Sequence, residues 1–353
     1  MGTYKKIVLA GIISVTLFAI TSIYSWPERD YSISTNNYIE ENQTKTEKTV
    51  LVSGKPIGIY VKSKGIMVIG TSEISDYEGN IFKPSQDALM RGDYILGVNG
   101  VEIKDKATLM DMVSASNGES VTLDVLRDKE QIKVTINPIK TYNGKYMMGA
   151  WVKDDIAGIG TLTFIDENKF VALGHSINDN DTGELFELSD GGMYETKLVN
   201  IVKASKGSPG RIEGVIDYSK ESLIGRINEN DAYGISGKIV GTQVDEQEGI
   251  RMPVADKNEI KTGKAYIYSC INGKGQFYEI NITDINYNSY SDGKNMKIKV
   301  TDLNLLNETN GIIQGMSGSP IIQDGKLVGA VTHVFVNDPT RGYGIFIENM
   351  LEH

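Results

Sequence analysis

The chain opens with an apolar stretch, continues with a polar one, and then alternates short apolar runs with turn-forming residues to its end. Residues 7–24 carry no charge and follow Lys5 and Lys6. Eighteen residues form about 27 Å of helix, close to the thickness of a bilayer core, and a basic flank stays cytoplasmic. Residues 1–27 are therefore predicted to be a signal or anchor segment with a membrane helix. No Ala-x-Ala pattern follows, which favours an uncleaved anchor over a cleaved signal peptide.

Residues 28–48 are rich in Ser, Thr, Asn and Glu and lack apolar periodicity, so they are predicted to be a flexible linker. From residue 49 the pattern changes to short apolar runs separated by Gly, Pro and Lys, which predict strands. Residues 107–116 have apolar positions at helical spacing, and Asn99-Gly100 is a hairpin-type turn. We therefore expect a small α/β domain over residues 49–140.

The strand pattern continues from residue 141 to the end of the chain with little helical periodicity. Predicted strands include residues 158–164, 170–175, 198–202, 237–240, 265–268, 297–300 and 326–331. About 200 residues of this kind indicate an all-β barrel or a pair of barrels over residues 141–353. The fold class is thus mostly β.

Composition narrows the classes of function. Acidic residues (46) exceed basic ones (36), and a net charge of -10 argues against a nucleic-acid-binding protein. Cys270 is the only cysteine, so the chain has neither an internal disulfide nor a multi-cysteine zinc site. No motif predicts a metal or another cofactor. Of the three histidines one is the last residue, so histidine chemistry depends on His175 or His333.

A candidate nucleophile lies in residues 315–320, Gly-Met-Ser-Gly-Ser-Pro. Ser317 stands in a glycine turn, and the N–H groups of Gly315 and Ser317 are spaced to form an oxyanion hole. Trypsin-like proteases have a similar Gly-Asp-Ser-Gly-Gly-Pro segment before a strand. From the residues alone, a plain glycine turn with surface serines is the alternative.

The candidate general base is His175, which ends an apolar strand where the chain turns. A structural histidine at a strand end is the alternative, and His333, 16 residues after Ser317, is the rival base. A serine–histidine pair also needs a group that holds the imidazole tautomer. Spacing does not rank the acids that are candidates for this role: Asp179, Asp181 and Asp302.

Residues 91–100, Arg-Gly-Asp-Tyr-Ile-Leu-Gly-Val-Asn-Gly, resemble a signature of bacterial PDZ domains. Residues 56–59, Pro-Ile-Gly-Ile, stand where that family has its carboxylate-binding loop. The resemblance implies that N–H groups around Ile57, Gly58 and Ile59 hold the C-terminal carboxylate of a peptide that adds as a strand. A turn-forming role for Gly58 is the alternative.

Residues 157–164, 172–175 and 311–340, together with the order of segments, resemble the stage IV sporulation protein B peptidase family. The resemblance covers nearly everything after residue 49. It implies a chymotrypsin-like double barrel with a catalytic triad of His175, Asp302 and Ser317 and no cofactor.

The same resemblance implies a signalling serine endopeptidase of endospore-forming bacteria that acts in the space between the two forespore membranes. Its implied partners are a regulator of the membrane-embedded complex that processes the sigma-K precursor, and the enzyme itself, through self-cleavage. The alternative is a catalytically inactive PDZ-containing scaffold that binds partner C-termini. A cysteine or metal enzyme is disfavoured, since Cys270 has no histidine near it in sequence.

Overall fold

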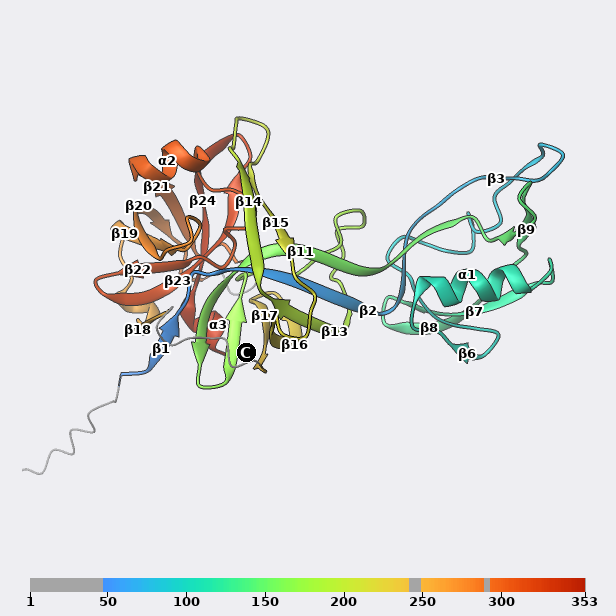
Figure 1. Cartoon of the computed structure of the whole chain (residues 1–353), viewed down its shortest axis with the longest axis horizontal. Helices are drawn as coiled ribbons and strands as arrows, with labels where there is room; N and C mark the ends of the chain where they lie inside the picture. Colours follow the sequence, from blue (N-terminus) through green and yellow to red (C-terminus); the bar gives the residue numbers. More distant parts are fainter. Residues whose placement is uncertain (1–46, 241–248, 289–292, 353) are drawn as a thin grey trace, which may run out of the picture. The chain divides into compact units, whose positions relative to one another are not determined.

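A computed structural model describes residues 47–240, 249–288 and 293–352. No helix within these ranges is long and apolar enough to cross a bilayer. The membrane helix predicted at residues 7–24 lies outside the described residues, as does nearly all of the predicted linker. The strands of the described chain form two barrels and a smaller module (Figure 1).

The first barrel consists of six antiparallel strands, each paired with two others. In ring order they are β2 (Pro56–Thr71), β11 (Ala150–Asp166), β12 (Lys169–Ala172), β17 (Gly234–Ile239), β16 (Leu223–Asp231) and β13 (Leu188–Tyr194), which pairs again with β2. β1 (Thr49–Val52) pairs with β11 and with β18 (Ile250–Pro253). Apolar side chains of the six strands fill the interior, among them Ile57, Leu162 and Phe170.

The second barrel is also closed and six-stranded. Its strands are β19 (Gly263–Ser269), β20 (Gln276–Ile285), β21 (Met296–Val300), β22 (Pro320–Gln323), β23 (Lys326–Phe335) and β24 (Asp338–Phe346). Helix α2 (Leu303–Thr309) follows β21, and α3 (Ile347–Leu351) follows β24. A separate hairpin consists of β14 (Thr196–Val202) and β15 (Arg211–Ile216). The prediction of a mostly β chain is confirmed.

The smaller module lies between the barrel parts of β2 and β11 in the sequence. Its elements are the far half of β2 with β3 (Ile74–Ser75), β4 (Ile81–Phe82), β5 (Tyr94–Val98), β6 (Val101–Glu102), α1 (Lys106–Ala115), β7 (Val121–Arg127), β8 (Glu130–Ile136), β9 (Ile139–Lys140) and β10 (Tyr146–Met147). Asp105 caps the N-terminus of α1, where its carboxylate accepts the N–H of Thr108, and the helix buries Leu109 and Val113. The predicted helix at residues 107–116 is present.

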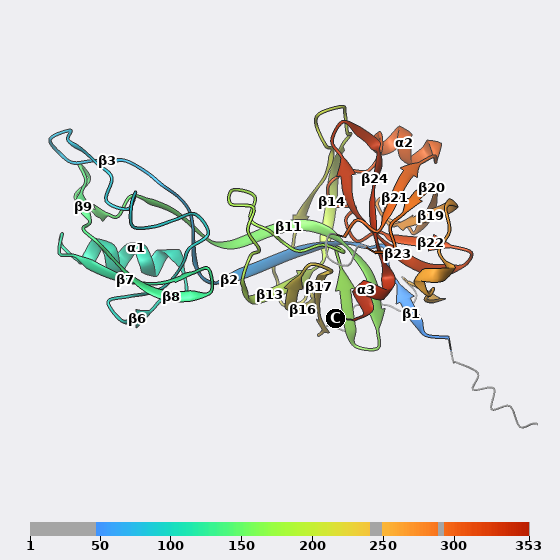
Figure 2. The same cartoon turned by 180° about the vertical axis from the view of Figure 1, so that it is seen from behind.

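The domain boundary predicted at residue 141 does not separate the smaller module from the barrels. β1 and the first half of β2 belong to the first barrel, where they pair with β11, and β2 also pairs with β13. β2 and β11 pair from Pro56–Thr161 to Thr71–Ala150, so two continuous strands connect the barrel and the smaller module (Figure 2). The smaller module is thus an insertion into the first barrel rather than a domain that precedes it.

The prediction that residues 57–59 form a carboxylate-binding loop is wrong, because these residues belong to a strand of the first barrel. Ile57, Gly58 and Ile59 lie inside β2, where Gly58 pairs with Ile159 on one side and Tyr194 on the other. Ile57 and Ile59 are buried in the barrel core. A strand that is paired on both edges has no free N–H groups to offer a peptide carboxylate.

Gly58 is instead required by packing. A Cβ atom at Gly58 would lie 2.5 Å from Cγ2 of Ile216. We expect Gly58→Val to lower the free energy of unfolding by about 1–3 kcal/mol through overpacking. Gly70→Val is the matched control, because Gly70 lies on the same strand and a Cβ there meets no atom within 4 Å. Urea unfolding of both variants measures the difference, and equal stabilities would contradict the packing role.

Candidate active site

Ser317 lies in the turn between α2 and β22. Gly315 and Gly318, on either side of it, have φ angles of 100° and 92°, which side-chain-bearing residues rarely adopt. A Cβ atom at Gly318 would also lie 2.2 Å from the carbonyl oxygen of Thr161. Both glycines are therefore needed for the turn that presents Ser317.

Two threonines of the first barrel hold this turn. The hydroxyl of Thr161 donates to the carbonyl of Gly315 at 2.7 Å, and the hydroxyl of Thr163 donates to the carbonyl of Gly318 at 2.8 Å. The N–H of Thr161 also donates to the carbonyl of Ser317 at 3.0 Å. Both threonines are buried on β11, so a segment of the second barrel is fixed to a strand of the first.

The N–H groups of the turn separate into two sets. Those of Met316, Gly318 and Ser319 donate to backbone carbonyls. Those of Gly315 and Ser317 have no hydrogen-bond partner among the residues that the structure describes. Two free N–H groups, one of them on the serine itself, are the arrangement that binds a developing oxyanion. The oxyanion hole predicted at Gly315 and Ser317 stays a prediction, and both of its N–H groups are available for it among the described residues.

His175 follows a strained turn at the end of β12. Leu173 and Gly174 have φ angles of 71° and 72°, and for a branched residue such as Leu this conformation is costly. Nδ1 of His175 lies 2.8 Å from the carbonyl oxygen of Ser176. Because a carbonyl only accepts, Nδ1 carries the proton, and Nε2 is left as the basic nitrogen.

Burial lowers the pKa of His175 below its ordinary value, and the hydrogen bond to Ser176 acts in the opposite direction. The half-buried imidazole therefore prefers the neutral form. A neutral imidazole with a free Nε2 is the state in which histidine accepts a proton.

The structure brings the nucleophile turn and the histidine turn together. A Cβ atom at Gly318 would lie 2.6 Å from the backbone nitrogen of Leu173, two residues before His175. In this conformation the hydroxyl of Ser317 donates to the carbonyl of Thr332 at 2.9 Å rather than to His175. Catalytic hydrogen bonds are often absent until substrate binds, and a rotation of the hydroxyl redirects this donor.

His333 lines the same site. Its ring centroid lies 5.2 Å from that of His175, and the two planes are tilted by 39°. His333 follows Thr332, whose carbonyl holds Ser317. Both candidate histidines predicted from the sequence therefore stand beside the nucleophile turn. His175 stays the predicted base, because Ser176 holds its Nδ1 and its side chain is less exposed than that of His333.

Asp302 is not brought to His175. Its carboxylate caps helix α2 and accepts the N–H groups of Asn304 at 2.9 Å and Leu305 at 3.1 Å. β21 approaches the histidines with the end that is far from Asp302. Gly293, just before β21, is the residue near Gly174 and His333. Asp302 follows the other end of β21, whose five residues span about 13 Å. The structure gives Asp302 a capping role and no contact with the imidazole.

The other candidate acids lie in two parts of the first barrel, one beside Lys153 and one beside the turn before His175. Asp179 is buried and binds Lys153, which also binds Asp181 at 3.0 Å. Asp231, which no sequence motif pointed to, ends β16 and pairs with Gly234. A Cβ at Gly234 would lie 2.9 Å from the nitrogen of Gly174. Asp231 therefore stands near the turn that carries His175.

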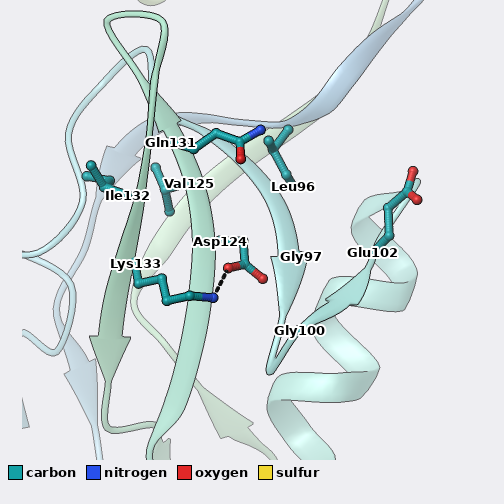
Figure 3. A pocket seen from close by; sticks show the side chains of 9 residues that line it. All are labelled: Leu96, Gly97, Gly100, Glu102, Asp124, Val125, Gln131, Ile132 and Lys133. Carbon is teal, nitrogen blue, oxygen red and sulfur yellow. Dashed lines mark hydrogen bonds and ion pairs between the residues drawn. The ribbon is translucent and has the colours of Figure 1, made fainter.

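A pocket of about 360 Å³ lies elsewhere, on the smaller module (Figure 3). Its lining comes from β5 to β8 and includes the ion pair of Lys133 and Asp124, with their atoms 2.5 Å apart. None of the predicted catalytic residues lines it.

Comparison with known proteins identifies the family. A family model described as SpoIVB peptidase S55 matches residues 144–351. The chain belongs to the SpoIVB peptidase family. S55 membership agrees with the resemblance found in the sequence and makes the chain a member of a serine peptidase family.

Two solved structures illustrate the similarity of this S55 chain to known folds. A variant of the HtrA-type protease AlgW with a decapeptide is 13% identical, with a TM-score of 0.33 over 58% of this chain and 52% of that one. An inactive mutant of Rv3671c from M. tuberculosis H37Rv is 12% identical, with a TM-score of 0.29 over 55% of this chain and 80% of that one. The chain thus matches about half the length of the AlgW structure. No curated protein matches the chain.

Asp302 is a helix cap in the structure and a triad acid by resemblance, and these two roles predict opposite results for Asp302→Asn. Asparagine is as good an N-cap as aspartate, so we expect the free energy of unfolding and the rate of Ser317 acylation to stay close to those of the unaltered chain. Asp302→Ala should lose about 1 kcal/mol of stability. Thermal unfolding and labelling by a serine-directed reagent measure both. A loss of about 10⁴-fold in acylation by Asp302→Asn would instead place Asp302 in the triad.

Proposed function

We propose that the chain is a serine endopeptidase in which Ser317 is the nucleophile and His175 the general base. The observation that carries this proposal is the glycine turn of Ser317, with two free N–H groups, held by Thr161 and Thr163 on the barrel that bears His175. Membership of the S55 family supports it.

Each part of the site has a step in the reaction. The hydroxyl oxygen of Ser317 attacks the scissile carbonyl while Nε2 of His175 takes the hydroxyl proton. The N–H groups of Gly315 and Ser317 stabilise the oxyanion of the tetrahedral intermediate. The imidazolium then gives its proton to the leaving amine, and the acyl-enzyme is hydrolysed by a water that His175 activates in the same way. The carbonyl of Ser176 keeps the proton of Nδ1 in place throughout.

The biological role in this proposal is that of a sporulation signalling protease. The family supports cleavage of a regulator of the complex that processes the sigma-K precursor, and cleavage of the enzyme itself. Attachment through residues 7–24 and action between the forespore membranes belong to the same proposal. The smaller module would bind extended peptide segments as a PDZ-like module, without the loop predicted at residues 57–59.

The assignment of the nucleophile is tested by a pair of serine variants. Ser319 is fully buried, and its hydroxyl has no hydrogen-bond partner within the described part of the chain. Ser317→Ala should abolish self-cleavage, a loss of about 10⁶-fold in a triad enzyme. Ser319→Ala should keep self-cleavage and leave the free energy of unfolding unchanged or higher by about 1 kcal/mol, because an unpaired buried hydroxyl is costly.

The measurement is mass spectrometry of fragments released by the purified full chain. His175→Ala should behave like Ser317→Ala, and His333→Ala should retain cleavage. Retained cleavage in Ser317→Ala, or loss in Ser319→Ala alone, would contradict the assignment. If the unaltered chain neither cleaves itself nor reacts with a serine reagent, the inactive scaffold is the correct interpretation.

A further inference from the structure

The peptide group between Ser176 and Ile177 holds the imidazole of His175 on one side and an amide side chain on the other. Its carbonyl oxygen lies 2.8 Å from Nδ1 of His175. Its N–H donates to Oδ1 of Asn230 at 2.7 Å. Because a peptide group is planar and rigid, the side chain of Asn230 fixes the plane of the carbonyl that binds His175.

Asn230 also connects this peptide to the far side of the same loop. Its Nδ2 donates to the carbonyls of Ile177 and Phe186, each at 3.0 Å. The N–H of Phe186 donates to the carbonyl of Ile177 at 3.1 Å, and the side chain of Phe186 is fully buried. The two ends of the loop formed by residues 176–187 are therefore joined through one amide.

The outer part of this loop is held by the smaller module and its connecting strand. The hydroxyl of Tyr94, on β5, accepts the N–H of Glu187 at 2.9 Å and donates to the carbonyl of Leu185 at 3.2 Å. Tyr94 is buried, and burial raises its pKa to about 12, so the hydroxyl stays protonated and able to donate. Lys153 of β11 binds the buried carboxylate of Asp179 in the same loop.

We propose that Asn230 is the positioning residue for His175 and that Tyr94 couples this positioning to the smaller module. The coupling runs from Tyr94 through the backbone on both sides of Phe186 to Asn230, and from Asn230 through the Ser176–Ile177 peptide to Nδ1 of His175. The proposal rests on the proposed function of His175. Asn230 takes the orienting role that the sequence predicted for Asp302, because Asp302 caps a helix elsewhere.

The chemistry of the side chain explains why an amide serves here. Asn230 must accept one N–H and donate to two carbonyls at once, and an amide has both an acceptor and two donor hydrogens. An ionised carboxylate accepts only, so it would repel the carbonyls of Ile177 and Phe186. The residue therefore acts on His175 through a peptide group and touches no reacting atom.

The test uses the full chain and a sulfonyl fluoride, with kinact and KI taken from the saturation curve of Ser317 labelling. Asn230→Ala should lower kinact by about tenfold or more and leave KI within about twofold, because a misplaced base slows the chemical step and not binding. Tyr94→Phe keeps the ring and removes both hydroxyl bonds, and it should lower kinact by about threefold.

Tyr60→Phe is the matched control, because its hydroxyl donates to Asp155 on the neighbouring strand and makes no bond to the loop. It should leave kinact unchanged. Amide hydrogen exchange over residues 175–187 gives a second measurement that needs no activity, and it should be faster in Tyr94→Phe than in Tyr60→Phe.

Equal kinact values for Tyr94→Phe, Asn230→Ala and the unaltered chain would overturn the proposal, as would equal exchange in the two tyrosine variants. An unaltered chain that is not labelled at all would instead overturn the proposed function, and the exchange result would then decide the coupling alone.

Discussion

The hydrogen bonds from Thr161 and Thr163 to the carbonyls of Gly315 and Gly318 are the interaction on which the site depends. The nucleophile belongs to the second barrel and the base to the first, so neither barrel holds a complete site. Two buried hydroxyls donate to the carbonyls on either side of Ser317 and so fix the orientation of the peptide groups that follow Gly315 and Gly318. Gly318 permits the contact because its lack of a Cβ lets the turn approach within van der Waals distance of β11 and Leu173.

The first barrel places its own half of the site through strand pairing. β12 pairs with β11 on one side and with β17 on the other, and this fixes where the turn at Leu173 and Gly174 begins. The same β11 continues into the smaller module, where it pairs with β2 and carries Lys153. One strand thus contacts the nucleophile turn near its end and the loop after His175 near its beginning.

Much of the site was predictable from local sequence, because turns and strand ends leave local signals. The glycines around Ser317 and the apolar strand before His175 indicated a nucleophile and a base, and the structure brings these turns together. The role of Gly58 was not predictable, since an apolar run with one glycine is the same in a loop that leads into a strand and in the strand itself. Its place depends on pairing with Ile159, about a hundred residues away in sequence.

The acidic partner of His175 was also not predictable from local sequence. An aspartate before an apolar run is an N-cap signal, and Asp302 followed by Leu303 carries that signal as clearly as it carries the resemblance to a triad residue. Asn230 carries no signal, because an amide near a strand end has many roles and its partners, Ile177 and Phe186, are about 50 residues away. Long-range contacts of this kind need the assembled barrel.

The dependence of the site on these two threonines is tested by Ser317 labelling in the double variant Thr161→Val and Thr163→Val. Valine keeps the shape of threonine and removes both donors, and each buried carbonyl left without a partner costs about 1–3 kcal/mol. We expect the barrels to stay folded and the labelling rate to fall by about a hundredfold, because the turn leaves β11. Thr196→Val, which removes a hydroxyl bond in the hairpin of β14 and β15, should have no effect. An unchanged labelling rate in the double variant would mean that the two threonines do not hold the nucleophile turn in its reactive position.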